Sequence, residues 1–143
     1  MNYGQFVGDV QGRTHLRSTD EAEAVVANVF RAIAEVLPHR NVEALGGSLP
    51  AELMVYLRGA HEEPDPYFDE HLFLGWVVST IDATGSRDKT AGGLDLYAHY
   101  SGDEAQYRCE SVFAALKPLI EDAQRELILS YLPEGIAELF AQA

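Results

Sequence analysis

Histidines and carboxylates crowd one short stretch of the sequence. The run HEEPDPYFDEH contains His61, Glu62 and His71 among several further acids. Imidazole nitrogens and carboxylate oxygens are ligands that zinc and manganese take in proteins, so these three residues are candidate metal ligands. Their spacing matches no known metal motif. A solvated acidic linker accounts for the same composition, and the sequence favours that interpretation.

A second candidate site combines aromatic rings with a histidine. Trp76 precedes, and Tyr97, His99 and Tyr100 lie within or directly after, the glycine-rich stretch DATGSRDKTAGGLDLYAHY. Together they could line a pocket for a small ligand, because ligand sites are mostly apolar with a few polar groups. The alternative is that Trp76 packs in the core and the tyrosines anchor a loop.

The single cysteine, Cys109, could in principle act as a nucleophile with His15, His39 or His99 as base. Its place in the apolar pattern predicts instead a buried thiol with a raised pKa, which is unreactive. No Ser-His-Asp order, phosphate-binding glycine loop or nucleotide fingerprint is visible. The sequence therefore predicts no catalytic residue and no cofactor, and it leaves an enzymatic activity uncertain.

The elements that must position these residues follow from an internal repeat. Shifting the sequence by 83 positions aligns STDEAEAVVANVFRAIAEVL with SGDEAQYRCESVFAALKPLI without a gap, and the same register reaches two Leu-Pro steps at residues 49–50 and 132–133. A repeated pattern of this length indicates two copies of one structural unit.

Each copy has the pattern of a long amphipathic helix. Ser18 with Glu21, and Ser101 with Glu104, have the Ser-x-x-Glu spacing of a capping box, which marks a helix start. Apolar residues then recur at three-and-four spacing. In the first copy they are Ala22, Val26, Val29, Phe30, Ile33, Val36 and Leu37, and in the second Ala105, Cys109, Val112, Phe113, Leu116, Leu119 and Ile120.

Proline residues should mark the helix boundaries. Pro50 and Pro133 stop an incoming helix and fit the first turn of the next, so each Leu-Pro step predicts a corner between two helices. Pro118 predicts a kink or an early stop. Gly46 and Gly47 predict a short or frayed third helix in the first copy.

These patterns predict an all-α fold, a helical bundle of two tandem related four-helix repeats that share one core. The chain, 1–143, is expected to form a single domain. We assign repeat one to 2–58, an acidic linker to 59–67, and repeat two to 68–141 with an insertion at 82–101.

The arrangement resembles a bacterial family, the domain of unknown function 2267. The residues that carry the resemblance are Tyr3 with Phe6, the segments DEAEAVVANVF and DEAQYRCESVF, and the corner LPAEL at 49–53. The second copy departs from the pattern with LPEGI and with its insertion. The resemblance implies an all-helical protein of uncharacterised activity and supplies no catalytic residues.

Charge and hydropathy exclude several classes of function. The 143 residues carry a net charge of −13 and no run of about 20 apolar residues, so binding to nucleic acid or to a membrane is not expected. We expect a cytoplasmic, non-catalytic module that binds a protein partner, itself or a ligand. The alternatives are an enzyme or a small-molecule or metal binder at the 82–101 insertion, and an acidic mimic of nucleic acid.

Overall fold

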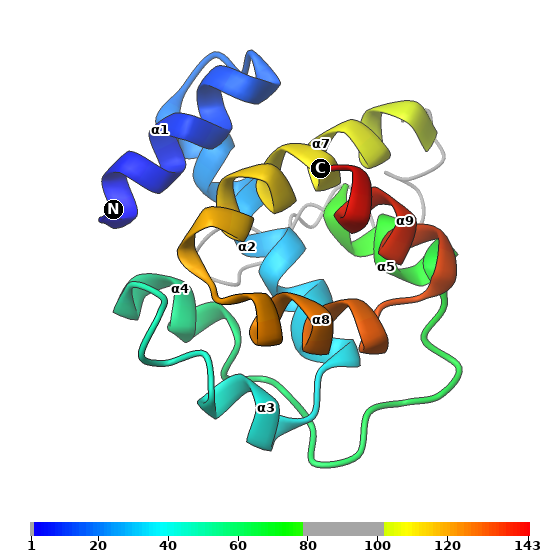
Figure 1. The fold of residues 1–143 in the computed structure, drawn as a ribbon. Helices are drawn as coiled ribbons and strands as arrows, with labels where there is room; N and C mark the ends of the chain where they lie inside the picture. Colours follow the sequence, from blue (N-terminus) through cyan, green and yellow to red (C-terminus); the bar gives the residue numbers. More distant parts are fainter. Residues whose placement is uncertain (1, 79–101) are drawn as a thin grey trace.

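The computed structural model describes residues 2–78 and 102–143, and these are helices joined by turns and loops, with no β-strand among them (Figure 1). The all-α prediction is confirmed. The elements are α1 (Tyr3–Thr14), α2 (Thr19–Val36), α3 (His39–Glu43), α4 (Ala51–Tyr56), α5 (Glu70–Val77), α7 (Gly102–Leu116), the 3₁₀ helix η1 (Lys117–Leu119), α8 (Asp122–Tyr131) and α9 (Glu134–Gln142).

The two long helices lie where the apolar spacing predicts them. The hydroxyl oxygen of Ser18 accepts a hydrogen bond from the backbone N–H of Glu21 at 3.1 Å, which begins α2. Every predicted apolar residue of α2 is buried, and so are those of α7 from Ala105 to Leu116. The predicted cap of α7 at Ser101 lies outside the described residues.

The buried apolar residues form one cluster to which both halves of the chain contribute. Helix α1 packs on α2 and α7, while α5 packs on α2, α7 and α9 (Figure 1). Phenylalanine rings connect these helices: the Phe6 and Phe30 ring centroids are 5.9 Å apart, and Phe113 lies 6.5 Å from Phe73 and 5.1 Å from Phe140. The core therefore depends on contacts between the N-terminal and C-terminal halves.

Both Leu-Pro steps form the predicted corners. Pro50 directly precedes α4 with φ −55° and ψ 148°, and Pro133 directly precedes α9 with φ −55° and ψ 150°. The leucine before each proline is buried, as is the apolar residue four positions after that leucine. The relation of the two halves as repeats of one unit, with the boundaries assigned above, stays a prediction.

The departure LPEGI in the second corner has a tertiary explanation. The side chain of Glu70, from the first turn of α5, lies against Gly135, and a Cβ added there would stand 2.2 Å from the Glu70 Oε2 atom. Glycine thus makes room for a carboxylate beside the first turn of α9, where the partial positive charge of the helix N-terminus favours an acid.

Proline and glycine also act where the sequence predicts. Helix α7 ends at Leu116, and Pro118 lies in the following 3₁₀ turn. Helix α3 has 5 residues, compared with the 10 of α8, and the chain continues from α3 through turns that contain Gly46 and Gly47. No helix in the described part of the chain is both long and apolar enough to cross a bilayer.

Among the residues that the structure describes, one residue other than glycine has a left-handed backbone. His15 ends α1 with φ 56° and ψ 30°. This conformation brings the Cβ close to the backbone, whereas glycine adopts it without that penalty. We expect His15→Gly to raise the free energy of unfolding by about 0.5–1 kcal/mol.

Urea denaturation of His15→Gly and of His15→Ala tests this expectation. Alanine retains the Cβ, so His15→Ala should show no gain. Equal stability of the two variants would contradict the backbone argument.

Candidate functional site

One predicted ligand residue, Trp76, lies beside a pocket between α2, α4 and α5. The pocket has a volume of about 210 Å³. Trp76 is half-buried on α5, and the guanidinium carbon of Arg31 on α2 lies 5.4 Å from the centroid of the Tyr56 ring on α4. The lining residues are Arg31, Ala34, Glu35, Val55, Tyr56, Gly59 and Trp76. This combination of rings with one cation and one carboxylate suits a small polar ligand.

Tyr56, which lines this pocket, forms a hydrogen bond with Tyr3 at the start of α1. The hydroxyl oxygens of Tyr3 and Tyr56 are 2.9 Å apart and share a hydrogen bond. Burial, the hydrogen bond to Tyr56 and the nearby carboxylates of Glu23 and Glu52 raise the pKa of Tyr3 well above its ordinary value near 10. Tyr3 therefore keeps its proton and has a structural role in positioning Tyr56.

The raised pKa makes folding sensitive to alkaline pH. Above pH 10 the unfolded chain releases the Tyr3 proton while the folded protein retains it, so the free energy of unfolding should fall as pH rises. We expect Tyr3→Phe to cost about 1 kcal/mol at pH 7 through the lost hydrogen bond. It should also make the loss of stability between pH 10 and 11 less steep.

Urea denaturation at pH 7, 10 and 11 measures both effects. Tyr67→Phe is the matched control, because Tyr67 is 83% exposed. A pH dependence in Tyr3→Phe as steep as in the parent protein would contradict the assignment.

The other predicted pocket residues, Tyr97, His99 and Tyr100, lie outside the described residues, as does the insertion at 82–101. Sequence reasoning missed Arg31, Glu35 and Tyr56. Arg31 and Glu35 are four residues apart on α2, which places them on one helix face. That spacing was the available signal, but nothing in the sequence joined the pair to Trp76.

The candidate metal ligands lie at different places around the linker. The Nε2 atom of His61 is 3.1 Å from the Glu35 Oε2 atom, and Glu62 and His71 are exposed. Within the described ranges, no three His, Cys, Asp or Glu side chains form a group that could hold a metal ion. The metal site at His61, Glu62 and His71 stays a prediction.

Cys109 lies in the core, as its place in the apolar pattern predicts. Its side chain is fully buried among the apolar residues of α7, and this burial raises the pKa of the thiol. A neutral thiol that is shielded from solvent is neither a nucleophile nor a metal ligand.

A family model places the chain among known sequences. The model of the uncharacterised conserved protein family DUF2267 matches residues 3–139, which is nearly the whole chain. The chain belongs to the DUF2267 family. No curated protein shows significant sequence similarity to it. The family match confirms the resemblance carried by Tyr3, Phe6 and the LPAEL corner.

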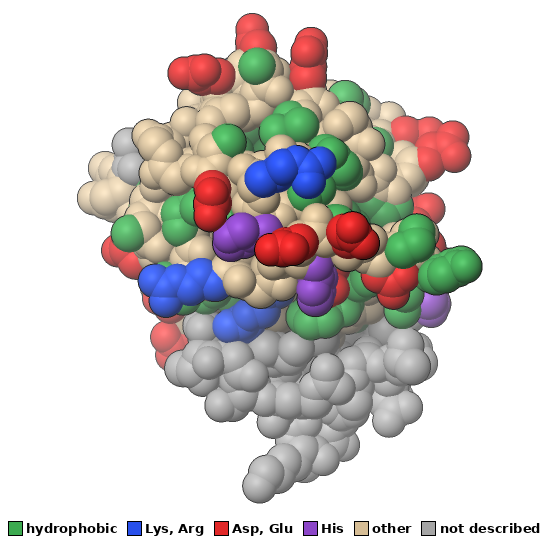
Figure 2. Space-filling view, turned by 90° about the horizontal axis from the view of Figure 1, so that it is seen from below, with side chains coloured by type: hydrophobic (Ala, Val, Ile, Leu, Met, Phe, Trp, Pro, Cys, Tyr) green, Lys and Arg blue, Asp and Glu red, His purple; other side chains and the backbone are tan. Residues whose placement is uncertain are grey.

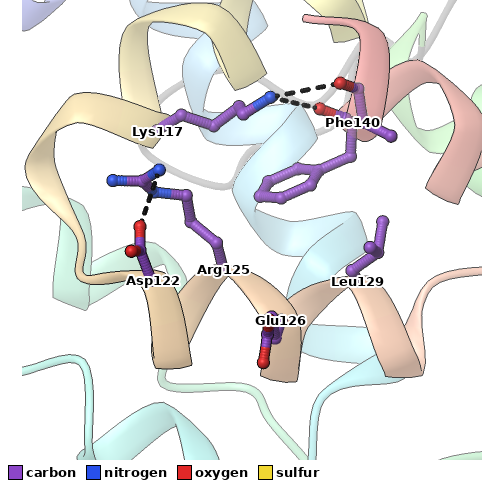
Figure 3. A pocket seen from close by; sticks show the side chains of 7 residues that line it. Lys117, Asp122, Arg125, Glu126, Leu129 and Phe140 are labelled. Carbon is purple, nitrogen blue, oxygen red and sulfur yellow. Dashed lines mark hydrogen bonds and ion pairs between the residues drawn. The ribbon is translucent and has the colours of Figure 1, made fainter.

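A second pocket of the DUF2267 chain has a volume of about 310 Å³ and lies between η1, α8 and α9 (Figure 3). Its two cationic side chains, Lys117 and Arg125, donate hydrogen bonds to backbone oxygens at the ends of α9 and η1. The Nζ atom of Lys117 donates to the backbone oxygens of Phe140 and Ala143, each at 2.9 Å, and a guanidinium nitrogen of Arg125 donates to the Ile120 oxygen at 3.2 Å. Arg125 also pairs with Asp122 at 3.1 Å. These contacts give the two cations a structural role.

Of the three pockets considered, the one with the greatest volume is an open depression of the DUF2267 chain that we call the linker groove. Its volume is about 360 Å³, and it lies where the linker between α4 and α5 passes the end of α2 and the corner between α8 and α9 (Figure 1). Its lining is mostly apolar, with three prolines and two aromatic rings: Val36, Pro64, Asp65, Pro66, Phe68, Tyr131 and Pro133. Such a surface suits the side chains of a docked protein segment.

Proposed function

We propose that this protein is a non-catalytic interaction module of a bacterial cytoplasm, and that a protein partner docks in the linker groove. The observation that carries this proposal is the groove itself. It collects three prolines and two aromatic rings from two separate parts of the chain, and Val36 from a third, into one open apolar surface. Aromatic anchors in such a depression supply most of the binding energy of many protein interfaces.

The sizes of the pockets support docking of side chains over enclosure of a metabolite. The linker groove and the pocket beside Trp76 have volumes of about 360 and 210 Å³. Sites that enclose a small molecule usually measure about 300–1,000 Å³, so the groove is at the lower end of this range and the Trp76 pocket is below it. One or two side chains of a partner would fill either site.

The two titratable groups with a shifted pKa in the described part of the chain also favour binding over catalysis. Catalytic acids, bases and nucleophiles need pKa values close to the working pH. Burial raises the pKa of both Tyr3 and Cys109, which moves each group further from that range and keeps it neutral. These two residues stabilise the fold without offering a reactive group.

Capture of a partner on the immobilised protein tests this proposal when groove variants are compared. Phe68→Ala removes a ring from the groove, and Leu72→Ala removes a similar apolar side chain that is 39% exposed and does not line it. Once the retained protein is purified, its affinity is measured by calorimetry. We expect Phe68→Ala to weaken binding by about tenfold or more and Leu72→Ala to change it little.

Thermal melting of each variant establishes that it is folded before binding is measured. Equal affinities of a folded Phe68→Ala and of the parent protein would refute docking in the groove.

A second candidate function is binding of a small molecule in the pocket beside Trp76. The observation that favours it is the proximity of Trp76, Tyr56 and Arg31 in one pocket. Trp76 is the single tryptophan of the chain, so its fluorescence reports on this pocket alone.

A metabolite screen should find a compound that changes the Trp76 emission and raises the melting temperature. Tyr56→Ala should abolish both effects, and Leu72→Ala should preserve them. The involvement of Tyr97, His99 and Tyr100 is tested by the same measurement on His99→Ala. An emission change that survives both Tyr56→Ala and His99→Ala would exclude this site.

A further inference from the structure

We infer that the linker groove binds a lysine- or arginine-bearing segment of the partner protein. This inference rests on the proposed function and adds the chemistry of the partner. It follows from the charges of the segments that form the groove, from the rings that line it and from the contacts that hold the linker in place.

The residues that line the groove include one carboxylate, Asp65, and no lysine or arginine. The linker segment 59–67, which supplies Asp65, also carries the exposed carboxylates of Glu62 and Glu63 and contains no lysine or arginine. A groove with this charge attracts cations and repels acidic segments.

The lining suits the two parts of a long basic side chain. Phe68 and Tyr131 present aromatic rings, which attract an ammonium or guanidinium group when it lies over a ring face. Val36 and the three prolines supply an apolar surface for the methylene stem of lysine or arginine. An apolar partner residue would use this surface but leave the Asp65 carboxylate without a cationic counterpart.

The linker is held in shape by hydrogen bonds within the protein. A carboxylate oxygen of Asp65 accepts a hydrogen bond from the Tyr67 N–H at 2.9 Å, and the Phe68 N–H donates to the Asp65 backbone oxygen at 3.2 Å. At the other end of the linker, the backbone oxygen of His61 accepts a hydrogen bond from the His39 N–H at 2.9 Å. The ring of His61 pairs with the Glu35 carboxylate. A preformed groove loses less conformational entropy on binding.

The wider surface agrees with this charge distribution. Figure 2 shows acidic side chains at many places on the face that it views, whereas lysine and arginine side chains gather at few. Histidine and acidic side chains lie together near the middle of this face. Two such pairs occur in the structure, His39 with Glu43 at 3.0 Å and His61 with Glu35 at 3.1 Å. Hydrophobic side chains are interspersed among the charged ones.

Fluorescence anisotropy with two synthetic peptides tests the inference. The probe is a labelled peptide of five alternating Lys-Pro units, and the comparison peptide has glutamate at each lysine position. We expect the lysine peptide to bind, its affinity to fall as salt is raised because screening weakens exposed charges, and the glutamate peptide not to bind.

Substitutions of acidic residues test whether the lysine peptide binds in the linker groove. Asp65→Asn removes the charge but keeps an oxygen that accepts the Tyr67 N–H bond, so the linker should hold its shape. It should weaken binding by about threefold, and the triple variant Glu62→Gln, Glu63→Gln, Asp65→Asn by about tenfold. Asp20→Asn is the control, because it removes the same charge at the other end of α2, about 24 Å along the helix from Val36.

Each remaining outcome overturns the inference in a distinct way. Equal losses in Asp65→Asn and Asp20→Asn would show attraction to the net charge of −13 without a site. Competition by free spermidine at the same total charge would assign the groove to a small polyamine. Concentration-dependent sedimentation that Asp65→Asn abolishes would assign it to a second copy of this chain.

Failure of the inference is distinguishable from failure of the proposed function. A lysine peptide that does not bind, together with a captured partner whose affinity depends on Phe68, would remove the cationic partner and leave the interaction module in place.

Discussion

Phe113→Ala should lower the free energy of unfolding by about 3–5 kcal/mol. The Phe113 ring is fully buried on α7, with its centroid 5.1 Å from that of Phe140 on α9 and 6.5 Å from that of Phe73 on α5. Truncation would leave a cavity where three helices meet and would remove two ring contacts at once. Urea denaturation followed by circular dichroism measures the change.

Tyr67→Ala is the control for this prediction because it also removes an aromatic ring, but from a side chain that is 83% exposed. Its effect should stay within about 0.5 kcal/mol. A loss below about 1 kcal/mol in Phe113→Ala would mean that α5, α7 and α9 do not depend on one another as the ring contacts indicate.

Native Cys109 should react with a thiol reagent at least about a thousandfold more slowly than the same thiol in urea. The side chain is fully buried, so the reagent reaches it only when α7 opens, and opening costs a large part of the stability of the fold. The raised pKa of the thiol lowers the rate further, because the thiolate is the reactive form. Absorbance after addition of Ellman's reagent follows the reaction.

Ser130→Cys supplies an internal comparison, since residue 130 is exposed on α8. This variant should show one fast thiol and one slow thiol. If the parent protein reacted as fast as the unfolded chain, Cys109 would be accessible and the core around α7 would be loose.

Local patterns in the sequence were sufficient to predict where α2, α4 and α9 begin and where α7 ends. Ser18 caps α2, Pro118 stops α7, and the two Leu-Pro steps precede α4 and α9, as their chemistry requires. These features act within one or two helical turns, so no knowledge of the tertiary structure is needed. The burial of the apolar stripes was predictable for the same reason.

The caps of the other helices were harder to predict from the sequence. Asn2 with Gln5 forms a capping box at the start of α1, and at the start of α8 the Glu121 N–H donates to the Gln124 Oε1 atom at 2.9 Å. Both differ from the Ser-x-x-Glu pattern, and a glutamate cap is uncommon. Asp69 caps α5, which begins at Glu70.

The sequence by itself determined an all-helical chain with buried apolar stripes and an acidic, lysine-poor surface, because spacing and composition are properties of the chain. Only the tertiary structure decided the pocket beside Trp76 and the linker groove. Arg31, Tyr56 and Trp76 are separated by 20 or more residues, as are Val36, Phe68 and Tyr131. Sites of this kind depend on how the helices pack, and packing is set by the shape of the shared core, which no local pattern encodes.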